Sequence, residues 1–200
     1  DIGMTSVIVL TWGFQMFLAG MPMLLVLIAI ALAPLCLYAA YLFLPHVEKR
    51  IDRFFDGGTM QTTKSIESFS QGGFFGVGPG DGQVKLNLPD AHADFIFSVA
   101  AEEWGLIGCF MLLSCYTLIF LRCASISLHA QSTFTRLLAG SLGLTFILCA
   151  CINIGMVIGI LPVVGVPLPL FSYGGSSMIT SMIAFGIIMS IQTHKKLWSS

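Results

Sequence analysis

Ionisable side chains beside long apolar runs are the first residues of this sequence that could do chemistry. Asp94 directly precedes such a run, His92 lies two positions earlier, and Glu102 and Glu103 lie inside the run. An ionised group at membrane depth is costly, so such residues are candidates for function by default. Asp94 could act as a general base, or it could be the N-cap of a helix whose first amides its carboxylate accepts.

Two of these carboxylates do not form a catalytic pair if both are helical. Eight residues separate Asp94 from Glu102, which is ~12 Å along a helix axis, whereas the carboxyl groups of a retaining glycosidase lie about 5–5.5 Å apart. Asp94 would therefore act alone or with a partner from another segment. Glu102 and Glu103 could instead fix helix packing, and Asn153, deep in another apolar run, is expected to form hydrogen bonds between helices.

A second polar group follows the proline- and glycine-rich stretch at 160–171. Paired glycines before a helix present free N–H groups and the positive end of the helix dipole, which suits an anion such as a pyrophosphate. A re-entrant turn with capping serines explains the same pattern. The candidate residues are Ser172, Gly174, Gly175 and Ser176.

The glycine-rich and cysteine-containing segments do not indicate cofactor sites. Residues 72–82 contain six glycines but lack the Gly-Lys-Ser/Thr ending of a phosphate-binding loop, so we expect a turn or a re-entrant segment there. The six cysteines show no zinc-ligand spacing with a histidine and are expected to be free thiols in apolar surroundings. No metal-ligating residue is predicted.

The elements that must position these residues lie in lipid. Hydrophobic residues make up 56% of the 200 residues and charged residues 10%, with a formal net charge of −1, whereas soluble domains carry about 25% charged residues. A soluble fold of this length cannot bury so much apolar surface. This composition excludes a water-soluble enzyme, a disordered chain and a nucleic-acid binder that depends on net positive charge.

Five stretches are long and apolar enough to cross a bilayer core of ~30 Å. They cover about residues 2–19, 22–44, 95–121, 134–159 and 172–191. The predicted fold is therefore an all-α integral membrane protein, with one polytopic membrane domain over 1–200 and a long loop at 45–94. Within that loop, residues 46–55 have the spacing of a helix lying along the membrane interface, or of a short charged linker helix without lipid contact.

Lysine and arginine are spread almost evenly, with five on the side of the 45–94 loop and four on the other. Long loops count for less in the positive-inside rule, which favours a cytoplasmic C-terminus and an extracytoplasmic 45–94 loop.

Three motifs in this chain resemble those of the SEDS family, which includes the FtsW, RodA and SpoVE types. They are LPDAHADFIF at 88–97 with EEWG at 102–105, PLPLFSYGGSS at 167–177, and DIGMT at 1–5, which looks like the family's Pro-Asp-x-Gly-Thr element without its proline. The resemblance implies a bundle of about ten spans, of which this chain would be the C-terminal half. Residues 77–85 favour the FtsW type slightly, although 153–167 read more like the RodA type.

The resemblance also implies an activity. The family polymerises lipid II, an undecaprenyl-pyrophosphate-linked disaccharide-pentapeptide, into glycan strands on the outer face of the cytoplasmic (inner) membrane. It works with a class B penicillin-binding protein, a transpeptidase, among other membrane proteins of the division or elongation machinery. The family's essential aspartate maps onto Asp94, and Ala93 stands where the family usually has Thr.

The resulting hypothesis is an inverting glycosyl transfer with Asp94 as the base. Lys85, Arg50 and the turn from Ser172 to Ser176 are candidates for stabilising the pyrophosphate leaving group, and a divalent cation, Mg²⁺ or Mn²⁺, is a candidate for the same charge. His92 and Glu102 complete the predicted substrate-binding residues.

Two other classes of function remain open. A lipid II flippase would carry polar residues through the whole bundle and would need no base. A non-catalytic scaffold of the division or elongation complex would tolerate changes at Asp94 but not on lipid-facing surfaces. We expect the 200-residue chain on its own to be poorly active, because Asp1, Gln15 and Glu102 need partners from further spans.

Overall fold

The computed structural model describes residues 2–57, 59–84, 88 and 91–198, and every regular element in these ranges is a helix. This confirms the all-α membrane fold class. The helices are α1 (Ile2–Leu18), α2 (Met23–Phe43), α3 (Pro45–Phe55), α4 (Met60–Gly72), α5 (Ile96–Leu128), α6 (Thr133–Val157) and α7 (Gly175–Trp198).

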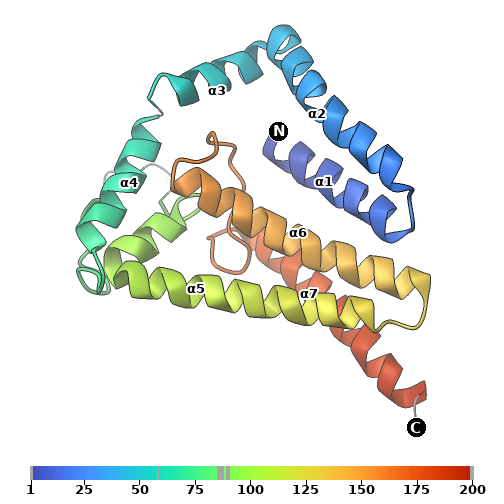
Figure 1. Ribbon diagram of the computed structural model, residues 1–200. Helices are drawn as coiled ribbons and strands as arrows, with labels where there is room; N and C mark the ends of the chain where they lie inside the picture. The colour runs from blue at the N-terminus through green and yellow to red at the C-terminus, as the bar shows by residue number, and fades with distance from the viewer. Residues whose placement is uncertain (1, 58, 85–87, 89–90, 199–200) are drawn as a thin grey trace.

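Helices α5 and α6 form the centre of the molecule and run side by side (Figure 1). Helix α1 packs along α6, α4 packs on the beginning of α5, and α7 contacts both central helices. Helices α2 and α3 form an arm that bends around this bundle (Figure 1). The loops after α4 and α6 gather at one end of the bundle, so residues far apart in the sequence meet there.

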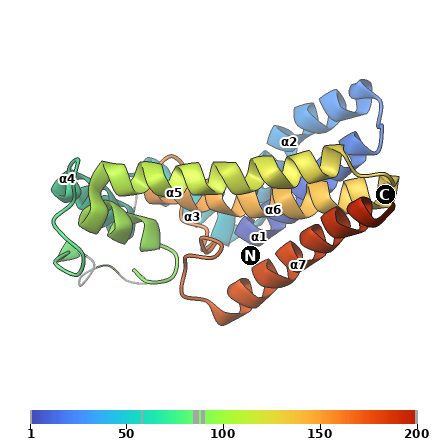
Figure 2. The same ribbon diagram turned by 90° about the horizontal axis from the view of Figure 1, so that it is seen from below.

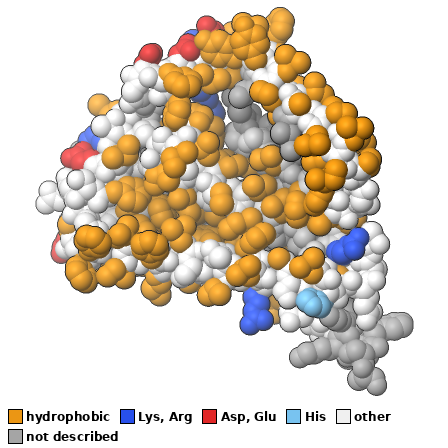
Figure 3. All heavy atoms as spheres, in the orientation of Figure 1, with side chains coloured by type: hydrophobic (Ala, Val, Ile, Leu, Met, Phe, Trp, Pro, Cys, Tyr) orange, Lys and Arg blue, Asp and Glu red, His pale blue; other side chains and the backbone are white. Residues whose placement is uncertain are grey.

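The apolar helices are long enough to cross a membrane. Helices α2, α5 and α6 and residues Gly175–Thr193 of α7 meet the length and hydropathy expected of spans, whereas α1 is a shorter apolar helix. Figure 3 shows a broad hydrophobic surface between charged side chains at two opposite ends. This arrangement is that of a multi-pass membrane protein.

Two short helices connect the spans α2 and α5. Helix α3 matches the predicted helix at 46–55, whereas α4 was not predicted. Helix α4 begins after Thr59, whose hydroxyl oxygen accepts a hydrogen bond from the N–H of Thr62 at 3.3 Å, an N-cap.

Helix α5 is broken at Gly105, which has φ 66° and ψ −163°. A regular helix would join the N–H groups of residues 106 and 107 to the carbonyls of 102 and 103. Instead these two N–H groups donate to the carbonyls of Gly73 and Phe74, at 2.9 and 3.3 Å. The carbonyls of Glu102 and Glu103 accept from the N–H groups of Val77 and Gly78, at 3.0 and 3.1 Å.

The glycine-rich segment 73–78 therefore replaces two helical hydrogen bonds of α5. A Cβ at Gly76 would lie 2.1 Å from the carbonyl oxygen of Glu103, and one at Gly105 would lie 2.4 Å from the nitrogen of Gly76. Only glycine permits this approach of the two backbones. The glycines serve the fold here.

The break also moves the two glutamates relative to the predicted third span. Residues 106–128 are about 35 Å long, enough to cross a bilayer by themselves. Glu102 and Glu103 lie before the break, in the part of α5 that packs on α4. Both glutamates lie in the helix predicted at 95–121, but the structure interrupts that helix directly after them, at Gly105, and continues it to Leu128.

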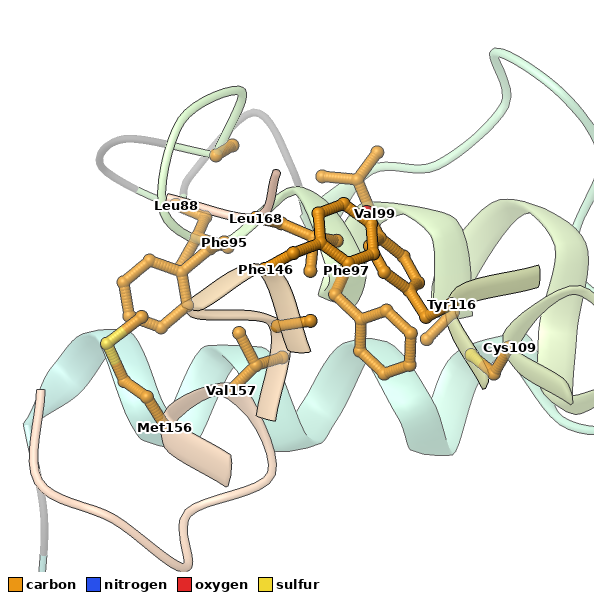
Figure 4. Packing of buried hydrophobic residues seen from close by; sticks show 13 residues of the cluster. Leu88, Phe95, Phe97, Val99, Cys109, Tyr116, Phe146, Met156, Val157 and Leu168 are labelled. Atoms are coloured by element: carbon orange, nitrogen blue, oxygen red, sulfur yellow. The ribbon is translucent and has the colours of Figure 1, made fainter. Parts of the chain in front are cut away.

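The hydrophobic core lies at the same end as the loops and joins α5, α6 and the segment after α6 (Figure 4). Phe95 lies over Met156, and Leu168 is fully buried beside them. The rings of Tyr116 and Phe146 stack with centroids 5.3 Å apart. This packing gives the residues just before α5 a rigid support.

Candidate active site

Asp94 lies in a turn at residues 91–95, directly before α5. Its side chain is half-buried. Of the two alternatives for Asp94, the N-cap was wrong, since α5 begins at Ile96 and its N-cap residue is Phe95, without a side-chain cap.

Asn153, on α6, binds the backbone of this turn through its side chain. Its side chain is fully buried, and its Nδ2 donates to the carbonyl oxygen of Asp94 at 2.8 Å and to that of Val166 at 2.7 Å. One amide therefore joins α6, the Asp94 turn and the connector between α6 and α7. The predicted hydrogen bonds between helices are not what Asn153 forms: it does use its amide between segments, but both acceptors lie outside helices.

The connector between α6 and α7 also binds the backbone of the turn. The hydroxyl of Ser172 donates to the carbonyl of Ala93 at 2.6 Å and accepts from the N–H of Leu168 at 2.7 Å. The N–H of Tyr173 donates to the carbonyl of His92 at 2.9 Å. The backbone carbonyls of three consecutive residues, 92 to 94, are thus all bound by other segments.

The carboxylate of Asp94 faces Gly165 of the connector. A Cβ added at Gly165 would lie 3.5 Å from Oδ2 of Asp94, and Gly165 itself is exposed, with φ 70°. A side chain at position 165 would therefore be in van der Waals contact with this carboxylate. Sequence reasoning did not single out Gly165, although a lone glycine within a proline-rich connector is a signal for close approach.

Glu102 lies in the interior and holds a neighbouring loop. It is 1% exposed, and its Oε1 accepts hydrogen bonds from the N–H groups of Gln83 and Val84, at 2.6 and 2.9 Å. Glu102 therefore holds residues 83 and 84, and the expectation that it needs partners from further spans was wrong, because these partners lie in this chain. Direct contact with a substrate stays a prediction. The side chain of His92 is exposed, and Lys85 lies outside the described residues.

The turn before α7 is only partly what the sequence predicted. The last helix begins at Gly175 and not at 172, so Ser172 belongs to the connector, where it is buried and its hydroxyl is used internally. Gly174 accepts a hydrogen bond from the Ser177 hydroxyl at 2.9 Å. Ser176 is exposed in the first turn of α7.

A cavity of about 340 Å³ opens beside Ser176, between α6 and α7. Figure 2 shows α7 diverging from α5 and α6 toward its N-terminal end. Pro167 and Pro169 of the connector form part of the wall, and most of the remaining lining is apolar. An apolar chain can therefore lie next to the polar turn.

Arg50 is not at the Asp94 turn. It lies on α3 and lines a separate pocket together with Arg53, against Pro162 and Val163 of the connector. Sequence reasoning missed Arg53, although its spacing of three residues from Arg50 places both on one helix face. In the part of the chain that the structure describes, no three His, Cys, Asp or Glu side chains meet in a way that could hold a metal ion.

Comparison with known proteins places this arrangement in a family. The family model of the FtsW/RodA/SpoVE cell cycle proteins matches residues 1–197. The peptidoglycan glycosyltransferase MrdB of Escherichia coli K12 is 42% identical over 209 residues, which cover 100% of this chain and 56% of that protein. A probable peptidoglycan glycosyltransferase FtsW of Buchnera aphidicola is 41% identical over 207 residues, 98% of this chain and 59% of that protein.

A solved structure shares the fold along the whole chain. It is described as "Structural coordination of polymerization and crosslinking by a peptidoglycan synthase complex", and it matches with a TM-score of 0.81 and 28% identity, over 100% of this chain and 57% of the other. The chain spans a little over half the length of the curated relatives it matches. Relatives of both names match with similar identity, so the preference for the FtsW type stays a prediction. This chain belongs to the FtsW/RodA/SpoVE family of cell cycle proteins.

Proposed function

We propose that this chain forms the catalytic end of a membrane-embedded peptidoglycan glycosyltransferase that polymerises lipid II into glycan strands. Its relatives MrdB and FtsW are named as peptidoglycan glycosyltransferases. The observation that carries the proposal is Asp94, a half-buried carboxylate on a turn whose backbone is held by Asn153 and Ser172. A carboxylate fixed in this way suits a general base.

In the proposed reaction, Asp94 takes the proton of the acceptor sugar hydroxyl, the 4-OH of its GlcNAc. The hydroxyl oxygen forms a bond to the anomeric carbon of the donor. The bond from that carbon to the pyrophosphate oxygen breaks, and its electron pair leaves with undecaprenyl pyrophosphate. A single displacement of this kind inverts the anomeric carbon, and a positioned base contributes a rate factor of about 10²–10⁴.

The leaving pyrophosphate develops negative charge that needs stabilisation. The first amides of α7, at Gly175 and Ser176, offer the positive end of a helix dipole. Lys85 and a divalent cation such as Mg²⁺ or Mn²⁺ remain candidates for the same task.

The proposed donor carries a long prenyl chain, and the α6–α7 cavity beside Ser176 supports the choice of a lipid-linked donor. Its apolar lining suits the first units of a prenyl chain, while its position at the start of α7 would keep the attached pyrophosphate near the first amides of that helix. A water-soluble sugar donor would have no use for such a cavity.

We further propose the orientation and the partners. The 45–94 loop and the Asp94 turn would face the outside of the cytoplasmic membrane, where lipid II is used, and the C-terminus would face the cytoplasm. The matching solved structure is of a synthase complex that couples polymerisation to crosslinking. This supports a class B penicillin-binding protein, a transpeptidase, as the partner.

The test is glycan strand synthesis from purified lipid II by the full-length protein carrying Asp94→Asn. We expect the rate to fall by about 10²–10⁴, because the amide cannot accept the proton. Asp56→Asn removes the same charge from an exposed position at the end of α3 and should leave the rate unchanged. A folded Asp94→Asn protein that makes strands at the wild-type rate would overturn the proposal.

The same variants separate the two other functions. A flippase would still move lipid II across vesicle membranes with Asp94→Asn, and a scaffold would support growth with that variant. If the protein is an enzyme, we expect Asp94→Asn to abolish both strand synthesis and growth and to leave transport of lipid II unaffected.

A further inference from the structure

A pocket of about 210 Å³ lies where α3, the start of α4 and the connector after α6 meet. The lining residues that matter here are Arg50 and Arg53 from α3, Gln61 and Thr62 from α4, and Pro162 and Val163 from the connector. Neither the catalytic proposal for Asp94 nor the α6–α7 cavity involves this pocket.

The charge of the pocket favours an anion. Arg50 and Arg53 are three residues apart on one helix and face the same space. None of the described residues that line the pocket is acidic. Gln61 and Thr62 add a side-chain amide and a hydroxyl that can donate further hydrogen bonds.

Arg50 is incompletely satisfied. Its Nη1 atom is buried and has no hydrogen-bond partner among the residues that the structure describes. A buried charged donor without a partner destabilises a protein, because its lost hydration is not replaced. The planar guanidinium matches the oxygens of a phosphate group, which can accept two parallel hydrogen bonds from it.

The position of α3 indicates where the anion comes from. Only Leu44 separates α3 from the end of the apolar span α2, so α3 begins at the level of the lipid headgroups. Val47 is buried against the protein, whereas Phe55 is 80% exposed, as expected of a helix that lies in the interface. The phosphate groups of lipids lie at this level of the membrane.

We propose that the Arg50–Arg53 pocket binds a phosphate-bearing anion, either the phosphate of a lipid headgroup or a free phosphate. The pocket wall at Val163 is two residues from Gly165, at most about 7 Å of chain, and Gly165 faces Asp94. Occupation of the pocket would therefore stabilise the connector close to the residue that faces Asp94. The binding itself does not require that Asp94 act as a base.

The test measures the affinity of the purified full-length protein in a neutral detergent, by the shift of its unfolding temperature. The probes are dioctanoyl phosphatidylglycerol, inorganic phosphate and, as a zwitterionic reference, dioctanoyl phosphatidylcholine. Arg50→Gln and Arg53→Gln should each weaken binding by about tenfold or more, the scale of a lost charge-assisted hydrogen bond. Lys49→Gln removes the same charge from an exposed position of α3 outside the pocket and should change the affinity less than about twofold.

The probes distinguish the two sources. Binding of phosphatidylglycerol alone assigns the pocket to a lipid headgroup, and binding of inorganic phosphate as well assigns it to the phosphate group itself. Arg50→Lys keeps the positive charge but loses the planar guanidinium, so we expect a loss of affinity smaller than that of Arg50→Gln. Should Arg50→Gln fail to fold, the variant at the exposed Arg53 still tests the pocket.

The proposal is overturned if no anionic probe binds, or if Lys49→Gln weakens binding as much as the two arginine variants do. Because the readout is binding, a failure here leaves strand synthesis by the wild-type protein untouched, and a failure of the Asp94 experiment leaves this pocket untouched.

Discussion

Two polar side chains from distant parts of the sequence hold the Asp94 turn in place. Asn153 of α6 binds the carbonyl of Asp94 itself, and Ser172 of the connector binds the carbonyl of Ala93. Both side chains are buried, next to apolar residues such as Phe95 and Leu168. The main chain that carries the proposed base therefore depends on two side-chain donors whose hydrogen bonds lie within the protein.

Asn153→Leu should destabilise the protein and slow it. The substitution leaves the carbonyls of Asp94 and Val166 without their donor, which costs roughly 1–3 kcal/mol for each buried group. We expect a lower midpoint of unfolding in detergent. At a temperature where the variant is still folded, we also expect a lower rate of strand synthesis at saturating lipid II.

Ser141→Ala is the matched control for this prediction. Ser141 is buried on the same helix, but its hydroxyl bonds only the carbonyl of Leu138 in the preceding turn. Its loss should change the unfolding midpoint little. If Asn153→Leu and Ser141→Ala behave alike, Asn153 does not position the turn.

The sequence alone identified single polar residues that lie beside or within apolar runs. Asp94 and Asn153 stand out because polar groups are rare in apolar runs. The hydrogen bond from Ser172 to Ala93 could not be predicted, since 79 residues separate the two and the bond depends on how the connector folds. The hydrogen bonds that Glu102 accepts from the N–H groups of Gln83 and Val84 could not be predicted for the same reason.

At the scale of the elements, the break of α5 and the glycine-rich segment form one structure. The segment 73–78 supplies two acceptors and two donors to the four backbone groups that the break frees, so none of these four groups is left unpaired. The part of α5 that carries Glu102 is thereby set off from residues 106–128, which are long enough to cross a membrane. The Asp94 turn directly precedes the first part.

Gly76→Ala and Gly105→Ala should each destabilise the protein strongly. Both residues have positive φ angles, 81° and 66°, which cost an alanine about 1–2 kcal/mol, and both would bring a Cβ within 2.4 Å of the opposite backbone. Backbone shifts that relieve such overpacking add about 1–3 kcal/mol. The measurement is the unfolding midpoint together with protease cleavage in the 73–84 loop.

Gly80→Ala separates the two contributions. Gly80 also has a positive φ, 92°, but nothing lies within 4 Å of its added Cβ, so only the backbone strain is expected. A Gly76→Ala variant that is no less stable than Gly80→Ala would contradict the close packing of the segment on α5.

The long helices were predictable from the sequence, and the details that shape the site were not. Apolar runs gave α2 and α6 to within two residues at each end. Helix α4 was missed because Met60–Gly72 has few apolar residues and owes its start to the Thr59 cap. The break at Gly105 was missed because its partners lie about 30 residues earlier, and a lone glycine does not reveal such a contact.

At the scale of the whole molecule, the polar loops meet at one end and a long apolar stretch separates them from the other. The Asp94 turn, the connector and α4 lie at the first end, while the short loop between α5 and α6 lies at the second (Figure 1). The window of α2 that could span a membrane is 0% buried, so lipid or further protein covers it. The proposed chemistry requires that the first end face the side where lipid II is used.

The arrangement predicts that Ser70 and Gln131 lie on opposite sides of the membrane. Ser70 is exposed on α4 and Gln131 is exposed in the loop after α5, and residues 106–128 between them span about 35 Å. A membrane-impermeant maleimide applied to intact cells should label Ser70→Cys, and Gln131→Cys only after permeabilisation. The wild-type chain is the control, because its six cysteines all lie within helices α2, α5 and α6. Labelling of both from one side would show that α5 does not cross the membrane. The reverse pattern would place Asp94 in the cytosol, where a base for polymerising exported lipid II has no substrate.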